Sequence, residues 1–271
     1  MILVISSENS YASKRLLEEA GVMSHELRVM SVSELAKKSF NINVSQYKAL
    51  YVRNPYLKGS AKYLPQIVKL AKKFKAAGKK VVDANIAKGE LGKGKWVDYQ
   101  KLMEAGLPIP KTSAFPSQPL PPQSYVLKWQ YGMGGKNVFL IQNKNQLKTI
   151  LPLHPKKEWL VQEFIWADYE YKVVTVGYKA LPVIVRFNIK RGGLRLDYDK
   201  YKVIKSPSAK KIAAIAQKAA KVLGRELAKV DILEKNGRFY ILEVNRFPGM
   251  ESFEELTRYN AVKKFIKYLG R

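Results

Sequence analysis

Two apolar runs that flank an Asn-Gly pair constrain the fold of this chain more than any other feature. Residues 230–233 and 239–244 are rich in β-branched, aromatic and aliphatic side chains, and Asn236-Gly237 supplies the positive φ angles of a tight turn, so the sequence predicts a β-hairpin. Asp231, Glu243 and Asn245 carry oxygen ligands within it. Glu243 and Asn245 are two residues apart and project from one face, roughly 7 Å apart, which suits adjacent ligands of a hard cation.

The register of the hairpin decides whether Asp231 joins them. A two-residue loop would pair Asp231 with Leu242 and place it on the opposite face from Glu243. A three-residue loop with a bulge at Gly237 restores the match, so we predict that bulge if the three residues share a Mg²⁺. The alternative is an ordinary hairpin whose polar residues face solvent. Glu243 lies between apolar residues, where a carboxylate needs a partner, and this favours the metal.

Composition narrows the class of protein. With 271 residues, of which 46% are hydrophobic, the chain can bury a sizeable core in two or three lobes. No apolar run is long enough to span a bilayer, and we expect a cytoplasmic protein with no membrane partner. The absence of cysteine excludes disulfides, thiolate metal sites and a cysteine nucleophile, and two histidines argue against a zinc site or a histidine-based triad.

The charge balance is strongly basic. The 49 Lys and Arg residues against 22 Asp and Glu give a net charge of +27, which points to anionic partners rather than to a particular fold. Two runs without acidic residues, 69–80 and 205–225, are expected to form helices with solvated basic faces. A polyanionic partner or substrate, such as an acidic protein, is one explanation. A Lys-rich proteome or adaptation to high temperature is the other, although thermophile charge usually rises in both signs.

Residues 1–90 alternate between apolar runs and amphipathic segments. Strands are expected at 1–6, 47–52 and 80–82, with helices at 10–20 and 61–77 and a further strand and helix within 27–38. This alternation predicts a small α/β lobe with a parallel sheet. Arg53 follows the strand 47–52, at the edge where open α/β sheets bind ligands, and we interpret it as a contact to a substrate anion.

Further along the chain, lysines and glycines suit phosphate binding. Lys95 lies in a Gly/Lys-rich loop before a predicted helix, and Lys128 lies on a predicted strand that leads into a turn with Gly132, Gly134 and Gly135. Glycines let backbone N–H groups approach phosphates closely, and a lysine supplies a point charge. The apolar run 159–165 is interrupted by Gln162 and Glu163 and predicts a strand.

Taken in chain order, these elements resemble the ATP-grasp superfamily, and within it the RimK-like carboxylate-amine ligases of the α-L-glutamate type. The resemblance implies an α/β (α+β) ATP-grasp fold, with an N-terminal lobe at 1–90, a central lobe with the glycine-rich loop at 91–180 and a C-terminal lobe with the metal site at 181–271. Three departures from the family pattern stand out. Gly94 replaces an Asp, Lys172 replaces an Arg, and the loop before Glu170 is short.

The resemblance also implies roles for individual residues. Lys95 and Lys128 would contact the phosphates of ATP, with the glycines closing over the γ-phosphate and Arg186 stabilising the phosphate in flight. The backbone of Glu163, Phe164 and Ile165 would bind adenine, and Glu170 a ribose hydroxyl. The expected ligands of Mg²⁺, with Mn²⁺ as a possible substitute, are Asp231, Glu243 and Asn245. The expected substrate contacts are Arg53, Asn188, Lys190, Arg191 and Arg246.

The implied activity is ATP-dependent ligation of a carboxylate to an amine through an acylphosphate, with release of ADP. Because the chain is so basic, we expect an acidic acceptor, either a peptide, a protein tail or a metabolite, to which an amino acid is joined. A homo-oligomer is possible. Two other classes remain open: an ATP-grasp phosphotransferase that stops after phosphoryl transfer, and a non-catalytic, basic nucleic-acid-binding protein.

Overall fold

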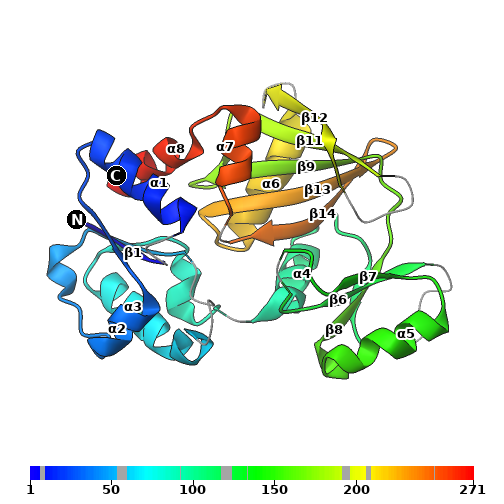
Figure 1. The fold of residues 1–271 in the computed structure, drawn as a ribbon, viewed down its shortest axis with the longest axis horizontal. Coiled ribbons are helices and arrows are strands. Elements are labelled where there is room, and N and C mark those ends of the chain that lie inside the picture. The colour runs from blue at the N-terminus through cyan, green and yellow to red at the C-terminus, as the bar shows by residue number, and fades with distance from the viewer. Residues whose placement is uncertain are drawn as a thin grey trace.

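The computed structural model describes residues 1–6, 10–53, 60–91, 93–116, 124–132, 134–190, 196–205, 209–246 and 248–271. Three β-sheets organise these residues, one near the N-terminus and two further along the chain. In Figure 1 the blue and cyan N-terminal part lies on one side, the green middle sheet on the other, and the yellow and orange sheet between and above them. Arg191, one of the predicted substrate contacts, lies outside the described residues.

The first sheet is parallel, as the alternating pattern predicts. Its order is β2-β1-β3-β4, and every pair is parallel. Its strands are β1 (Ile2–Ile5), β2 (Leu27–Met30), β3 (Ala49–Val52) and β4 (Lys80–Val81), and its helices are α1 (Tyr11–Val22), α2 (Val32–Lys37) and α3 (Leu64–Ala76).

Two boundaries in this part of the chain differ from the sequence expectation. The α1 helix begins after the predicted cap, Ser10, whose side chain accepts from the Ser13 amide, but it continues through Gly21 to Val22. The first positive φ after the helix belongs to Ser24, so Gly21 has no need to end it. Residues 60–63 form a 3₁₀ turn before α3 rather than its first α-helical turn. The 3₁₀ helices are η1 (Val44–Gln46), η2 (Ser60–Tyr63), η3 (Ala84–Lys88), η4 (Leu151–Leu153) and η5 (Lys156–Glu158).

The second sheet is antiparallel and small. Its order is β5-β8-β6-β7, with β5 (Thr112–Ala114), β6 (Tyr125–Trp129), β7 (Val138–Ile141) and β8 (Trp159–Glu163). The helix α4 (Gly94–Glu104) leads into it, and α5 (Lys144–Ile150) lies against it (Figure 1). The predicted strand 159–165 ends at Glu163, so residues 164 and 165 are free to line a cavity instead of pairing.

The third sheet is the largest of the described part. Its order is β12-β11-β9-β13-β14, with the short β10 paired to β9, and α6 (Lys210–Val222) packs on one face through a row of alanines. The strands are β9 (Tyr169–Val176), β10 (Lys179–Ala180), β11 (Val183–Ile189), β12 (Leu196–Lys205), β13 (Leu227–Lys235) and β14 (Arg238–Asn245). Because β9 belongs to this sheet, the predicted boundary after residue 180 passes between paired strands. The division into three lobes stays a prediction.

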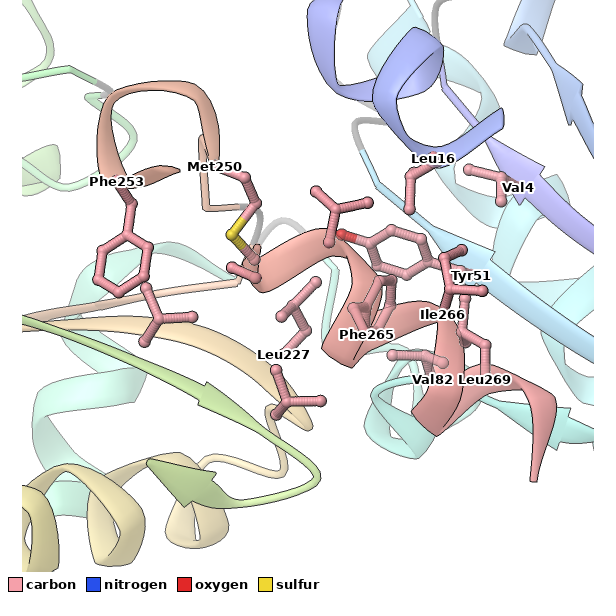
Figure 2. Close-up of a cluster of buried hydrophobic side chains, with 14 of the residues drawn as sticks. Val4, Leu16, Tyr51, Val82, Leu227, Met250, Phe253, Phe265, Ile266 and Leu269 are labelled. Carbon is pink, nitrogen blue, oxygen red and sulfur yellow. The ribbon is translucent and has the colours of Figure 1, made fainter. Parts of the chain in front are cut away.

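The C-terminal helices join the first and third sheets. The segment expected to be helical from 251 to 269 is two helices, α7 (Glu251–Thr257) and α8 (Ala261–Gly270). Figure 2 shows Phe265 and Ile266 of α8 between Tyr51 of the first sheet and Leu227 of the third. Phe265 and Tyr51 meet edge to face, with ring centroids 4.8 Å apart. The end of the chain therefore closes the core between two sheets that are far apart in sequence.

Candidate active site

The hairpin of β13 and β14 brings the predicted metal ligands together through a bulge that is not where the sequence suggested. Lys235 pairs with Arg238 across a two-residue turn at Asn236-Gly237, whose φ angles are 50° and 71°. The predicted bulge at Gly237 is therefore wrong. The register instead shifts between Asp231 and Ile232, where Leu242 is the extra residue of β14.

This bulge has the consequence that the predicted one would have had. Asp231 pairs directly with Glu243, so the two side chains share one face of the sheet. Asn245 lies on the same face, and its Nδ2 donates to Oδ2 of Asp231 at 3.1 Å. The Asn-Gly turn keeps its preferred two-residue form, while the extra residue is accommodated deeper in the hairpin.

Two lysines neutralise these carboxylates. The ammonium of Lys95 lies 2.5 Å from Oε1 of Glu243. The ammonium of Lys172 lies 3.2 Å from Oδ1 of Asp231 and also pairs with Glu170. Lys172 lies on β9, where it pairs directly with Asp231 of β13. In the sequence, Lys172 differs from the family pattern only in being lysine rather than arginine. Its contacts to two carboxylates depend on the pairing of β9 with β13, which local pattern does not fix.

The donor set fits a hard divalent cation. Asp231, Glu243 and Asn245 offer carboxylate and amide oxygens from adjacent positions, the ligand types that Mg²⁺ prefers. Oδ1 of Asp231 is buried, and the Lys172 ammonium, 3.2 Å away, is its charge partner rather than a well-aligned hydrogen-bond donor. Within the described part of the chain no cluster of three or more His, Cys, Asp or Glu side chains forms a metal site, so a cation here would rely on the amide as well as on the two carboxylates.

Burial and charge set the protonation of this cluster. Burial lowers the pKa of Lys128 to about 8, although Glu243, Glu170 and Asp231 oppose the shift. Burial likewise raises the pKa of Glu170, with Lys172 acting against it. At Glu243 burial alone would raise the pKa, but the Lys95 ammonium outweighs it and the pKa falls below its ordinary value. Two buried carboxylates, of Glu170 and Asp231, and the partly exposed carboxylate of Glu243 thus share the field of three lysines.

A cavity of about 110 Å³ opens between the second and third sheets, beside the carboxylates. Lys128 and the linker residues Glu163, Phe164 and Ile165 line one wall, and Glu170 lines the other. The Glu163 side chain also accepts from the Lys111 amide at 3.2 Å. The rest of the lining is Gln162 and five apolar residues for which the sequence pattern indicated no role in a site: Val126, Val138, Ile189, Leu233 and Leu242. Leu233 lies two residues after Asp231, so the alternation of side chains along the predicted strand could have placed it on the same face as that carboxylate.

The glycine-rich turn and Lys95 are neighbours. The Lys95 amide donates to the Gln130 carbonyl at 3.1 Å, which ties the start of α4 to the turn. A Cβ at Gly132 would lie 2.7 Å from the Lys136 carbonyl, and Gly134 and Gly135 have φ angles of 62° and 73°. The turn therefore requires its glycines for backbone reasons, whatever binds there.

Arg186 is not brought to the carboxylates. On β11 it pairs with Tyr171, while Phe187 pairs with Glu170, so the Arg186 side chain leaves the opposite face of the sheet from Glu170. Its guanidinium lies over the ring of Tyr169, 4.2 Å from the centroid. Asn188 also pairs on that opposite face, and Lys190 is exposed beyond the strand. The strand was predicted correctly, but its register could not be.

The two remaining predicted substrate contacts lie near the first sheet. Arg246 is buried, and its Nη1 donates to Oδ2 of Asp83 at 3.1 Å. Burial raises the pKa of Asp83 to about 6, and Arg246 and Arg225 only partly oppose this. Arg53 follows β3, where its amide donates to the Ile5 carbonyl. Arg246 is therefore held by a carboxylate of the chain itself rather than open to an anion.

This chain has a parallel α/β lobe at its N-terminal end, and after it two antiparallel sheets with a cavity between them. A buried lysine lies on one side of the cavity and paired carboxylates on the other. That combination defines the ATP-grasp class. A family model described as the RimK-like ATP-grasp domain matches residues 120–269. The chain belongs to the RimK-like ATP-grasp family, and it is a ligase of the ADP-forming class that makes C–N bonds.

Relatives of known sequence match along nearly the full chain. A probable alpha-L-glutamate ligase of Legionella pneumophila is 25% identical over 99% of this chain and 94% of its own length. A protein of the same description from Cellvibrio japonicus is 26% identical over 99% of this chain and 95% of its own length.

Solved structures agree on the fold. The ATP-grasp ligase PsnB complexed with a minimal precursor has a TM-score of 0.77 at 16% identity, covering 99% of this chain and 97% of that one. The macrocyclase MdnC bound to the precursor peptide MdnA, from Microcystis aeruginosa, has a TM-score of 0.74 at 15% identity, covering 100% and 99%. The D-alanine–D-alanine ligase of Bacillus anthracis has a TM-score of 0.62 at 16% identity, covering 99% and 95%.

No helix among the described residues is both long and apolar enough to cross a membrane. The cytoplasmic location expected from the sequence stays a prediction.

Proposed function

We propose that this ligase joins an amino acid to the carboxylate of an acidic acceptor, through an acylphosphate and with ATP as the phosphoryl donor. The observation that carries the proposal is the direct pairing of Asp231 with Glu243, whose charges act on Lys128 in the lining of the cavity between the two sheets. Oxygen ligands for a cation and a buried ammonium for phosphate are what phosphoryl transfer from ATP demands of a protein.

In this proposal ATP binds between the second and third sheets. Lys95 and Lys128 contact its phosphates, Gly132, Gly134 and Gly135 cover the γ-phosphate, and the backbone of 163–165 meets the adenine edge. Glu170 accepts from a ribose hydroxyl. The cavity of about 110 Å³ is smaller than the roughly 300 Å³ at which ligand sites begin, so in this proposal it holds only part of the ATP molecule, or the sheets separate as ATP enters.

Asp231, Glu243 and Asn245 are the proposed ligands of Mg²⁺, and Mn²⁺ is a possible substitute. A cation there would neutralise charge on the β- and γ-phosphates while the γ-phosphoryl group is transferred. Lys172 and Lys95, which pair with these carboxylates, would then be released toward the phosphates. Since Arg186 leaves the other face of the sheet, the register favours Lys172 as the cation nearest the transferred phosphate.

The reaction has two steps. An oxygen of the acceptor carboxylate attacks the γ-phosphorus, and the bond from the γ-phosphorus to the β-phosphate oxygen breaks. ADP is released, and the acceptor becomes an acylphosphate. The amine nitrogen of the amino acid then attacks the acyl carbon, inorganic phosphate departs, and the nitrogen loses a proton as the amide forms. Neither step needs a side-chain nucleophile, which agrees with the absence of cysteine and the scarcity of histidine.

The acidic nature of the acceptor rests on charge and on the relatives. A net charge of +27 favours anionic partners, and the named relatives are probable glutamate ligases. Structures of PsnB and MdnC include precursor peptides. A peptide or protein that carries glutamate is therefore our preferred acceptor, with Arg53 and Lys190 as contacts still to be tested.

The test is Mg²⁺-dependent ADP release in the presence of amino acids and acidic peptides. We expect one acceptor–amine pair to stimulate the wild-type enzyme, with the product increased by the mass of the amino acid less water. Glu243→Gln should abolish this stimulation. Glu234→Gln is the matched control, because Glu234 lies on the same hairpin but pairs with Tyr169 on the other face. Equal loss in both variants, or a stable phosphorylated product without an amide, would contradict the proposal.

A further inference from the structure

A second hollow lies away from the proposed active site. A groove of about 780 Å³ lies between the β9–β10 turn, α6 and α8, and it shares no lining residue with the cavity between the second and third sheets. Its floor is apolar and includes Val176, Leu181, Pro182 and Ala213. Ligand sites commonly have volumes of roughly 300 to 1,000 Å³, so this groove can hold a sizeable group.

The charged side chains around the groove are all positive. Its charged residues are Lys179, Lys210, Lys264, Lys267 and Arg271, and no acidic side chain lines it. None of these five forms an ion pair with a residue that the structure describes, and all are exposed. By contrast, Lys95 and Lys172 of the candidate active site are paired with carboxylates. The groove therefore presents unneutralised positive charge around an apolar floor.

The strand β9 runs from the cavity of the proposed active site to the groove. Glu170 of β9 lines the cavity between the sheets, and Val176 of the same strand lines the groove. Six residues at about 3.3 Å each separate them by roughly 20 Å. An extended peptide spans that distance with about six residues, because each adds at most roughly 3.3 to 3.6 Å.

We propose that this groove binds an acidic peptide segment of the acceptor, which alternates carboxylates with aliphatic side chains and lies about six residues from the carboxylate that reacts. The carboxylates meet the five cations, and the aliphatic side chains cover the floor. This inference rests on the proposed function, because it names the part of the acceptor that the enzyme holds outside its active site.

The aromatic residues of the groove favour a peptide over a nucleic acid. Single-stranded nucleic acids stack their bases on exposed aromatic rings. Tyr259 and Tyr268 instead pack against the core that joins the first and third sheets. The ammonium of Lys80 lies 3.5 Å from the ring centroid of Tyr268, and the Tyr268 hydroxyl donates to Glu226. The ring of Tyr268 is therefore held by contacts within the chain and does not serve as a free stacking platform.

The test measures peptide binding without ATP, so that it does not depend on catalysis. The probe is a fluorescein-labelled peptide that alternates glutamate and leucine, followed by fluorescence anisotropy at low and at physiological salt. The groove variant is Lys264→Glu with Lys267→Glu on α8. The matched control is Lys72→Glu with Lys75→Glu on α3, which has the same spacing, exposure and change in net charge. Circular dichroism checks that both variants are folded.

We expect the groove variant to lose at least about tenfold in affinity and the control less than about threefold, since general screening acts on both alike. Equal losses would overturn the inference, because they would show that net charge alone attracts the peptide. Tighter binding of a labelled oligothymidine than of the peptide, lost in the groove variant only, would also overturn it in favour of a nucleic acid.

A kinetic measurement separates this inference from the proposed function. If ligation occurs, KM for a peptide whose acidic segment lies six residues from the reactive glutamate should rise in the groove variant. The kcat, and the KM for a dipeptide acceptor, should stay unchanged. If no ligation is found with any acceptor but the groove variant still loses peptide binding, the groove stands and the proposed function fails.

Discussion

Asp83 lies where the first sheet meets the third, and burial and ion pairing act there in opposite directions. Its carboxylate accepts from the Glu226 amide and from Arg246, and only 2% of the residue is exposed. Burial wins and raises the pKa from 3.8 to about 6. A rise of about two units corresponds to about 3 kcal/mol at 1.36 kcal/mol per unit. Ionisation of Asp83 therefore destabilises the folded junction between the two sheets.

The direction of the pH effect follows from proton binding. Between about pH 4 and pH 6 the folded protein keeps the Asp83 proton, which the unfolded chain has already released. Since the folded state binds more protons in this window, stability falls as the pH rises through it. Asp83→Asn removes the titration and keeps one of the two acceptor oxygens. The hydrogen bond that is lost with the other oxygen lowers stability equally at every pH, so it does not change how the difference varies with pH. The free energy of unfolding of the wild type, less that of Asp83→Asn, should fall by up to about 3 kcal/mol between pH 4 and pH 7.

Urea unfolding at pH 4, 5, 6 and 7, followed by tryptophan fluorescence, measures this difference, because effects of other titrating groups cancel between the two proteins. A difference that rises with pH would refute the reasoning. It would mean that the ion pair with Arg246 outweighs burial and depresses the pKa of Asp83 in the folded protein.

Three further outcomes are expected. Lys172→Met leaves two buried carboxylates without their cation, so the variant should unfold at lower temperature, and Mg²⁺ should raise its Tm more than that of the wild type; a smaller Mg²⁺ effect would argue against a cation site there. The affinity for ATP should fall as the pH rises through about 8, where Lys128 loses its charge, and stay flat in Lys128→Arg; parallel profiles by calorimetry would exclude Lys128 as the titrating group. Gly177→Ala places a Cβ 2.6 Å from the ring of Tyr268 at a φ of 57° and should cost about 2–3 kcal/mol. Gly78→Ala, at a φ of 67° but with open space around the Cβ, should cost about 1 kcal/mol, and equal costs by urea unfolding would rule out the clash.

Periodicity predicted most of the elements correctly, because each depends on neighbours in sequence. The parallel first sheet, the cap at Ser10 and the β13–β14 hairpin all follow from local patterns of apolar, capping and turn residues. Boundaries were less certain. The helix expected to end before Gly21 continues to Val22, and residues 61–63, expected to begin an α-helix, form a 3₁₀ turn. Whether a glycine ends a helix, or a turn is α or 3₁₀, depends on what the next residues pack against.

The candidate site was predicted where its residues follow one another along a strand, and missed where it depends on pairing between strands. The order of lysines, glycines and carboxylates along the chain resembled the ATP-grasp family before any geometry was known. The contact of Lys172 with Asp231 and the position of Arg186 on the other face depend on how β9 pairs with β11 and β13. A shift by one residue reverses the face of every side chain on a strand, and sequence spacing does not fix that register.

The sequence by itself therefore determined the class of protein, the chemistry of the donor set and the excess of positive charge. The tertiary structure decided that a bulge at Leu242, not at Gly237, turns Glu243 toward Asp231. It also decided that Arg246 is held by Asp83, and that unpaired lysines from β10, α6 and α8 surround one groove. The physical reason is the same in each case: these arrangements arise from packing between segments distant in sequence, which no local pattern encodes.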